Sequence, residues 1–319
     1  MRVMESAQWL GVEMKENEKP SRDAPIFIGG FEMQVVSDRA MDLSDEQMQG
    51  LDVHLVPLTF TLDGKTYKSG VDIQPDEFYQ LIAATESFPA TSQPSAGDFA
   101  EVYQKIVASD PEILSIHISS GLSGTLNAAK AGAEMVPEAH VTFVDTKTLS
   151  GAEGWQVEAA VRAVKAGWAK DKILAMLEKI GAATDTIYTL ATLKYLIHGG
   201  RISHLKGLLG SVLNLKPLIG VEKELGKYAT LGQARTLEKA TLKIADHIAL
   251  TYPHGTALRT QVMHGHNAAG AALLRERMDQ LFKCTWLPTS SIAPVLGAHT
   301  GPGLVGIAYA PLAALPEMP

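Results

Sequence analysis

The sequence predicts an α/β protein with two α/β domains, the first built on a parallel sheet flanked by helices and the second on a mixed sheet with helices. In the first half, strand-like segments alternate with amphipathic helical segments, an order typical of parallel sheets. In the second half, a hairpin pattern joined through Gly226 adds antiparallel strands to a similar alternation. A length of 319 residues suits two domains, each large enough to bury its own core.

The composition is that of a globular protein with an acidic balance. Hydrophobic residues make up 46% and charged residues 20%, and 28 basic against 35 acidic residues give a net charge of −7. This balance argues against nucleic acid as the main partner, because neutralising phosphates requires clustered Lys and Arg. The single cysteine, Cys284, excludes an internal disulfide and fits a reducing compartment, so we expect a cytoplasmic protein. Its apolar strand-like surroundings indicate a packed residue rather than a nucleophile.

Residues 1–32 are expected to form a flexible N-terminal tail. The segment Met14–Asp23 is highly charged and poor in large apolar side chains, and it lacks the apolar stretch of a secretory signal. No later run is apolar for long enough to span a bilayer, so stable membrane insertion is not expected. We divide the remaining chain into an N-terminal domain at 33–160 and a C-terminal domain at 161–319, which meet in a long helical region.

In the N-terminal domain, the expected elements alternate between extended and helical. The predicted strands are Met33–Ser37, Val53–Phe60, Thr66–Tyr67, a central strand that begins at Ile113, and Val141–Val144. The predicted helices are one capped by Ser44, one opened by Pro75, one around Phe99–Ile106, one from Thr125 to Met135, and a long region over 152–166 and 170–180. The segment between Ala90 and Ser95 is expected to be a polar loop.

The C-terminal domain is expected to be a mixed sheet with helices. The predicted strands are Ile187–Leu190, Leu215–Val221, Lys227–Thr230, Gln261–Met263, Thr285–Leu287 and Leu304–Tyr309. The predicted helices are Leu193–Ile197, Leu237–Ala249 and Ala269–Leu281. An apolar helical stripe is also expected from the spacing of Leu205, Leu208, Leu209 and Val212, and such a stripe is more often core than ligand wall.

The loop Ser119–Gly124 is the strongest candidate site. It lies between the central strand and a helix, so it places hydroxyls and unpaired backbone N–H groups at a helix N-terminus, where phosphate or carboxylate binds readily. The simpler alternative is that Ser123 only caps the helix. Ligands of parallel sheets bind beyond the carboxyl ends of the strands, where Asp38 and Asp145 are also expected.

Other chemistries find weaker support in the sequence. A serine hydrolase with Ser123 as nucleophile, followed by Asp145 and His299 in chain order, remains an alternative, although Thr125 replaces the last glycine of the nucleophile-elbow motif. No Walker-type phosphate loop is present, and no His or Cys spacing indicates a metal site. Arg201 follows two glycines, and it is either a cation at a cleft or a solvated loop arginine. His299 is similarly a donor in a crevice or a turn residue.

Five short motifs then give the sequence a family resemblance. They are Thr-Ser-Gln-Pro-Ser at 91–95, Ile-Ser-Ser-Gly-Leu-Ser-Gly-Thr at 118–125, Gly-Gly-Arg-Ile at 199–202, Leu-Asn-Leu-Lys-Pro at 213–217 and His-Thr-Gly-Pro-Gly at 299–303. In this order, they resemble the DegV family of bacterial fatty-acid-binding proteins, from about residue 33 to 310. The resemblance implies two α/β domains that hold one long-chain fatty acid in a tunnel between them. It also implies a lipid-binding protein, not an enzyme, that presents the acyl carboxylate to an ATP-dependent fatty-acid kinase for acyl-phosphate formation.

The resemblance also implies roles for particular residues. The carboxylate would be bound by Thr91 and Ser123, and Arg201 and His299 would lie near the head group or on the surface that faces the kinase. The leucine stripe becomes a candidate tunnel wall, and no cofactor other than the fatty acid is expected. One motif departs from the family pattern, because Asp38-Arg-Ala-Met-Asp42 stands where family members usually have Asp-Ser-Thr-Ala-Asp. Arg39 therefore adds a cation that contacts either the carboxylate or the partner.

Overall fold

The computed structural model describes residues 33–208 and 215–319, which belong to one compact unit. The predicted tail at 1–32 lies outside the described residues, as do Leu209 and Val212 of the predicted leucine stripe. The predicted boundary after residue 160 falls within helix α5 (Ser150–Lys165), and the division into two domains stays a prediction. None of the helices in the described ranges has the length and hydropathy of a membrane span.

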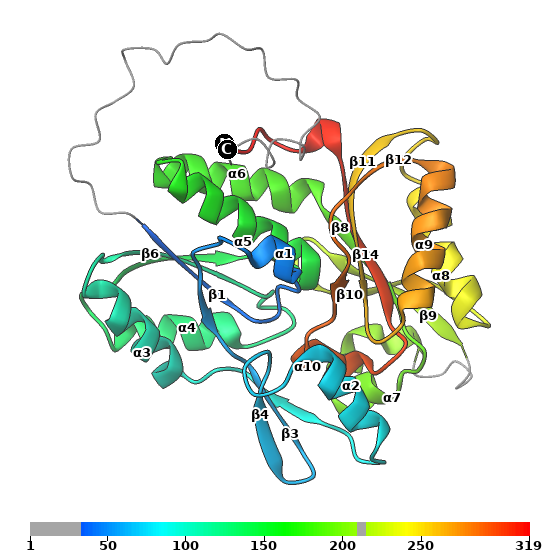
Figure 1. Ribbon diagram of the computed structural model, residues 1–319, viewed down its shortest axis with the longest axis horizontal. Coiled ribbons are helices and arrows are strands. Elements are labelled where there is room, and N and C mark those ends of the chain that lie inside the picture. Colours follow the sequence, from blue (N-terminus) through cyan, green and yellow to red (C-terminus); the bar gives the residue numbers. More distant parts are fainter. Residues whose placement is uncertain (1–32, 209–214) are drawn as a thin grey trace, which may run out of the picture. The chain divides into compact units, whose positions relative to one another are not determined.

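A four-stranded parallel sheet forms the first layer of the structure (Figure 1). Its order is β2-β1-β6-β7, with β1 at Gln34–Asp38, β2 at His54–Val56, β6 at Glu112–His117 and β7 at His140–Asp145. Helices α3 (Ala96–Val107) and α4 (Thr125–Glu134) cover one face, and α5 and α6 (Lys170–Ala183) cover the other. The predicted parallel sheet with flanking helices is confirmed.

Alternating side chains of the strands produce the two faces. Val36 and Ile113 pack with Phe99 and the rest of the α3 and α4 side, whereas Val35 and Leu114 pack with α5 and α6. This alternation is the period of two that places successive side chains on opposite faces of a strand. Because both faces are covered, the strands carry apolar side chains toward both layers of helices.

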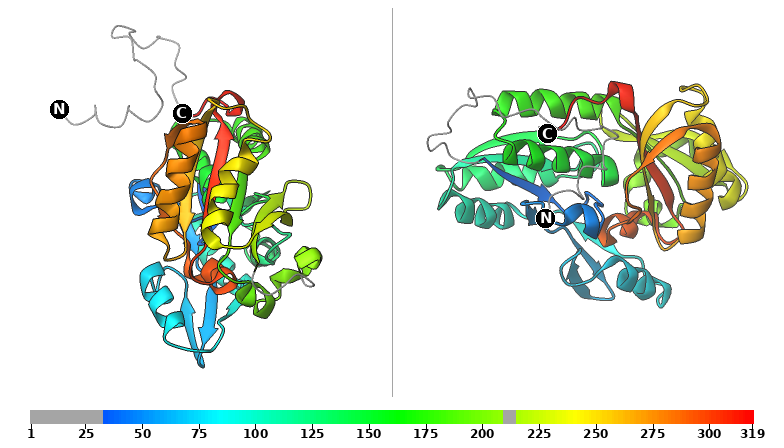
Figure 2. Two further views of the ribbon diagram at one scale, coloured as in Figure 1. Left: turned by 90° about the vertical axis from the view of Figure 1, so that its right-hand side faces the viewer. Right: turned by 45° about the horizontal axis from the view of Figure 1, so that its top comes forward.

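The second layer is a mixed seven-stranded sheet, which confirms the predicted fold class. Its order is β10-β9-β8-β14-β11-β12, and β13 also pairs with β11. The strands are β8 Asp185–Thr189, β9 Lys216–Glu222, β10 Lys227–Ala234, β11 Ala257–His264, β12 Lys283–Trp286, β13 Ser290–Ser291 and β14 Val305–Pro311. Helices α8 (Leu237–Ile248) and α9 (Ala268–Leu281) lie side by side over one face of this sheet (Figure 2).

A small antiparallel sheet corrects two sequence predictions. The extended stretch Val53–Phe60 is not one strand, because it is divided at Pro57 into β2 and β3 (Thr59–Leu62), which belong to different sheets. The segment predicted as a loop at 90–95 begins with strand β5 (Ala90–Ser92), which pairs with β3. This sheet also contains β4 (Lys65–Lys68) and packs against α2 (Pro75–Ala83).

The shorter helices contain two further corrections. His299 is not a turn residue, because it lies in α10 (Pro294–Thr300), which begins at a proline and ends at Gly301 with a φ of 70°. The predicted leucine stripe does not begin as a regular α-helix, since Arg201–Leu208 is a 3-10 segment with non-helical backbone angles at Leu205. The remaining short helices are α1 (Asp45–Met48), α7 (Lys194–His198) and a final 3-10 turn at Leu312–Ala314.

One buried cluster joins the two main sheets. Trp155 of α5 packs in it with Tyr188 of β8 and Ile219 of β9, and the Trp155 indole N–H donates to Gln261 Oε1 at 2.7 Å. Asp42, just after β1, makes a second polar link: its carboxylate accepts hydrogen bonds from Ser150 Oγ at 2.5 Å and from Ala293 N at 2.7 Å. Burial raises the pKa of Asp42 to about 7.

Candidate functional site

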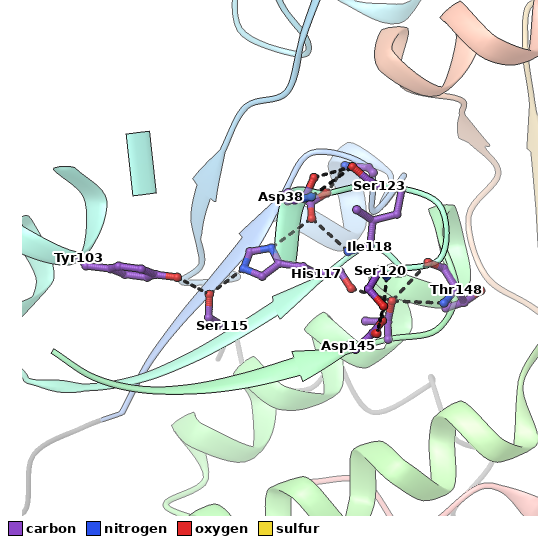
Figure 3. Close-up of polar contacts among 12 residues, drawn as sticks. Asp38, Tyr103, Ser115, His117, Ile118, Ser120, Ser123, Asp145 and Thr148 are labelled. Atoms are coloured by element: carbon purple, nitrogen blue, oxygen red, sulfur yellow. Dashed lines mark hydrogen bonds and ion pairs between the residues drawn. The ribbon is translucent and has the colours of Figure 1, made fainter. Parts of the chain in front are cut away.

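The carboxylate of Asp38 anchors the segment that leads into the candidate loop (Figure 3). It accepts hydrogen bonds from the backbone N–H groups of Ala40 and Ile118 and contacts His117 Nδ1 at 3.1 Å. His117 Nε2 in turn lies 2.6 Å from Ser115 Oγ, which bonds to the hydroxyl of Tyr103 at 2.8 Å. This chain of polar side chains fixes the end of β6 to the end of β1 and to helix α3.

The loop Ser119–Gly124 is held from both sheets. Ser119 Oγ donates to the carbonyl of Gly226, in the turn between β9 and β10, at 2.8 Å. A side chain at Gly121 would collide with the Leu225 carbonyl, so this turn packs directly on the loop backbone. On the other side, Ser120 Oγ donates to the Asp145 carboxylate at the end of β7 (Figure 3).

Ser123 does not cap helix α4 in the way that the simpler sequence interpretation expects. The N-cap residue is Gly124, which has no side-chain cap, and Ser123 Oγ instead accepts from the N–H of Thr125, the first helical residue. Ser123 Oγ also bonds to Thr125 Oγ1 at 2.8 Å. When Thr125 is the donor in that bond, the Ser123 hydroxyl hydrogen is available to a ligand.

Thr91 and His299 meet although they lie far apart in the sequence. Thr91 Oγ1 of β5 lies 2.8 Å from His299 Nε2 of α10. The side chain of Gln93, two residues after Thr91, lies against Gly124, where any Cβ would collide with Gln93 Oε1. The segment that carries Thr91 therefore packs on the loop that carries Ser123. The two residues predicted to bind a carboxylate thus lie on segments that contact each other.

Arg201 lies on the other side of His299. Its guanidinium donates to the carbonyl of Gly199 at 2.8 Å, and His299 Nδ1 packs so closely on Gly199 that a Cβ there would collide with it. The Arg201 side chain is half-buried, and its positive charge is near enough to act on the imidazole. Arg201, His299 and Thr91 thus form one continuous group.

His299 is held in its neutral form. Burial and, to a smaller extent, the charge of Arg201 lower the pKa of His299 to about 4. With its hydrogen on Nε2, the imidazole donates to Thr91 Oγ1 and leaves the Thr91 hydroxyl hydrogen free for a ligand oxygen. The buried Nδ1 atom has no hydrogen-bond partner among the described residues.

An apolar pocket begins beside this group. It is a small cavity of about 20 Å³, and it lies between the mixed sheet, the start of α5 and the helices α7 and α10. Its wall includes Leu196 and Leu296, from the two helices that also position Gly199 and His299. A few polar groups beside an apolar pocket are the usual arrangement of a site for an amphipathic ligand.

The residues of the hydrolase alternative are not assembled into a triad. Ser123 bonds to Thr125, Asp145 bonds to Ser120 and Lys147, and His299 bonds to Thr91. The hydroxyl, imidazole and carboxylate that do form a chain are those of Ser115, His117 and Asp38, and all three side chains are 0% exposed. Because Ser115 is fully buried and no substrate reaches it, we interpret this series of hydrogen bonds as structural. The thiol of Cys284 also fits a packed residue, since burial raises its pKa to about 12.

Comparisons with known proteins agree with the resemblance noted in the sequence. Residues 32–312 match the model of a family described as "Uncharacterised protein, DegV family". The chain belongs to the DegV family. A DegV domain-containing protein of Staphylococcus aureus is 32% identical over 273 residues, which cover 86% of this chain and 96% of the relative.

Solved structures of the DegV family have the same fold. A protein from Thermus thermophilus, described by its fatty acid binding, has 31% identity and a TM-score of 0.78, and the match covers 88% of this chain and 100% of that one. A stearic acid-binding protein from Eubacterium ventriosum has 26% identity and a TM-score of 0.76, with coverages of 88% and 98%. The DegV neighbours are thus characterised as fatty-acid-binding proteins.

Two residues of this DegV-family chain have a packing role that the sequence did not indicate. Gln93 and Gly199 serve as packing surfaces between the segments that carry Thr91, Ser123 and His299. Arg39, the departure from the family pattern, packs against Gly70, and burial lowers the pKa of its guanidinium. The sequence signal for Gly199 was its position directly before a second glycine and Arg201.

The depressed pKa of His299 predicts a pH-dependent stability. The unfolded chain binds a proton on His299 below about pH 6.5, whereas the folded chain does so only near pH 4. Stability due to His299 is therefore complete above about pH 6.5 and lost as the pH falls toward 4. Urea denaturation of delipidated wild type and His299→Gln measures it: the wild type should lose stability relative to the variant across this window. A stability difference that stays constant with pH would contradict the neutral assignment.

Proposed function

We propose that this protein binds a long-chain fatty acid between the two α/β domains at 33–160 and 161–319 and presents its carboxylate to an ATP-dependent fatty-acid kinase. The observation that carries the proposal is the Thr91–His299 pair, which lies beside an apolar pocket in a chain whose DegV neighbours bind fatty acids. In this proposal the protein is the substrate-presenting subunit of a cytoplasmic kinase system and forms no covalent bond with the acid.

The carboxylate is proposed to lie between Thr91 and Ser123. A carboxylate that leaves water must gain protein donors, since its uncompensated desolvation costs several kcal/mol. The hydroxyls of Thr91 and Ser123 supply two donors, provided that His299 Nε2–H and the Thr125 hydroxyl donate to them. Neutral His299 serves this arrangement because it orients the Thr91 hydroxyl.

The acyl chain is proposed to lie along the side chains that line the apolar pocket, which move apart to admit it because the cavity holds only about 20 Å³. Each buried methylene contributes about 0.8 kcal/mol, so the chain supplies most of the affinity while the hydroxyls fix its orientation. The pocket wall of leucine and isoleucine side chains, among them Leu190 and Ile219, suits a hydrocarbon. Leu205 is buried in the same core cluster, which supports a role for the start of the leucine segment as the lining of the site.

Removing one hydroxyl should weaken the binding of a fatty acid. A hydrogen bond to a charged group is worth about 1.5–3 kcal/mol, so Thr91→Ala and Ser123→Ala should each lower affinity about ten- to a hundred-fold. Titration of a fluorescent fatty acid into delipidated protein measures the change. A fluorescent fatty alcohol, which carries no charge, should lose much less affinity.

Matched controls separate the proposed contact from general damage to the loop. Ser120→Ala removes a hydroxyl from the same loop that bonds to Asp145, and it should leave affinity unchanged. Thr91→Ser keeps the hydroxyl and should retain most of the affinity. Unchanged affinity in both alanine variants would refute the carboxylate site, and loss of turnover on acyl esters without loss of affinity would instead favour a nucleophilic Ser123.

Arg201 is proposed to serve the phosphate or the kinase surface rather than the carboxylate. Arg201→Ala should leave fatty-acid affinity within about threefold of the wild type, because the carboxylate donors remain, but lower acyl-phosphate formation with a cognate kinase about tenfold or more. Arg201→Lys, which keeps the charge, should retain part of the activity. Equal losses of binding and phosphorylation would place Arg201 on the carboxylate.

A further inference from the structure

The first turn of helix α5 places a carboxyl group in the protein interior. Glu153 is 0% exposed, and no N–H or O–H group in the described ranges donates to its carboxyl oxygens with ordinary hydrogen-bond geometry. The neighbouring Glu158 of the same helix, in contrast, forms ion pairs with Arg162 and Arg259. Burying an unpaired carboxylate is so costly that the group normally keeps its proton instead.

The start of α5 packs tightly on the segment that follows β1. Ser150 Oγ, at the first residue of the helix, donates to the Asp42 carboxylate at 2.5 Å. About one turn later, a Cβ at Gly154 would collide with the carbonyl of Met41, so the two backbones are in direct contact. Glu153 lies between these two contacts, and its side chain is therefore confined against the segment that leads from β1 to α1.

The group that meets the Glu153 carboxyl is the carboxyl of Asp38. Asp38 acts on Glu153 through a side-chain hydrogen bond as well as through its charge. Both carboxyl groups are only acceptors when they are ionised, so a hydrogen bond between them requires that one of the two carries a proton. Asp38 already accepts from the N–H groups of Ala40 and Ile118 and contacts His117. These contacts suit a carboxylate, so the shared hydrogen belongs to Glu153.

The surrounding charges also keep this hydrogen on Glu153. Burial raises the pKa of Glu153 well above its usual range, and the negative charges of Asp38 and Asp42 raise it further. The other titratable groups that face this cluster are His117 of β6, Tyr79 of α2 and Tyr188 of β8. None of these three is a lysine or an arginine. An ionised Glu153 would therefore repel Asp38, whereas a protonated one binds it.

We propose that Glu153 is a positioning residue of the binding site: its protonated carboxyl donates to Asp38 and so helps to hold the backbone at Ile118, after which the loop Ser119–Gly124 begins. The inference rests on the proposed function, since it assigns the residue that completes the anchor of the loop proposed to bind the carboxylate. Its consequence for stability needs no ligand, so the proton on Glu153 and the proposed function are tested separately.

The first test measures stability against pH. The unfolded chain releases the Glu153 proton above about pH 4.3, whereas the folded chain keeps it, so the stability that this proton contributes falls as the pH rises. Urea denaturation of delipidated wild type and Glu153→Gln from pH 5 to 8 gives the ratio of their unfolding equilibrium constants. This ratio should rise by up to about tenfold per pH unit, because Gln has the same shape and does not ionise.

The ratio isolates Glu153, because Asp42 and His299 titrate in both proteins. Glu134→Gln, which changes an exposed glutamate at the end of α4, is the control and should follow the wild type at every pH. A ratio of wild type to Glu153→Gln that stays constant with pH would overturn the proposal, because Glu153 would then be ionised in the folded protein.

The second test asks whether the hydrogen bond from Glu153 positions the site. Glu153→Gln keeps an N–H donor for Asp38 and should retain the affinity for a fluorescent fatty acid at pH 7. Glu153→Met has a similar length but no donor, and it should lower that affinity about fivefold, as expected for one hydrogen bond. Equal affinities of the two variants would overturn the positioning role. If the wild type binds no fatty acid while the stability ratio changes with pH as predicted, the proposed function fails and the proton on Glu153 stands.

Discussion

The buried carboxylate of Asp38 is the constraint on which the candidate site depends. It fixes the backbone after β1 through Ala40 and the backbone after β6 through Ile118, and it orients His117 between them. The loop Ser119–Gly124 therefore leaves the sheet in a defined direction and meets the turn at Gly226 from the mixed sheet. The hydroxyl of Ser123, the neighbouring Thr91 segment and His299 are brought together only because this loop is held from both sides.

The proposed binding of a fatty acid requires a few polar contacts at one end of the ligand and many apolar contacts along the rest. A fatty acid needs donors at one end and hydrocarbon contacts along the rest, and the site offers the Thr91 and Ser123 hydroxyls beside an apolar pocket. Keeping His299 neutral matters in this setting, because its hydrogen bond orients the Thr91 hydroxyl without adding a buried charge.

Local patterns in the sequence predicted the fold class because each layer has a clear periodicity. The alternation around Val35 and Val36 and the helical spacing near Phe99 both reflect burial on covered faces. The division at Pro57, strand β5 and helix α10 were missed, because they depend on partners far away in the chain. The motifs identified Thr91 and His299 as candidates, but nothing local indicates that two residues 208 positions apart lie at 2.8 Å from each other. The series of hydrogen bonds that links Asp38 to Tyr103 is equally long-range.

Native mass spectrometry of the protein purified from a bacterial host tests the central claim most directly. The account predicts that the folded protein carries one non-covalent ligand with the mass of a long-chain fatty acid, and that denaturation releases it as the free acid. The measurement also reports chain length and any additional oxygen atoms. A folded protein that contains no acid and still takes up none when incubated with long-chain fatty acids would contradict the account.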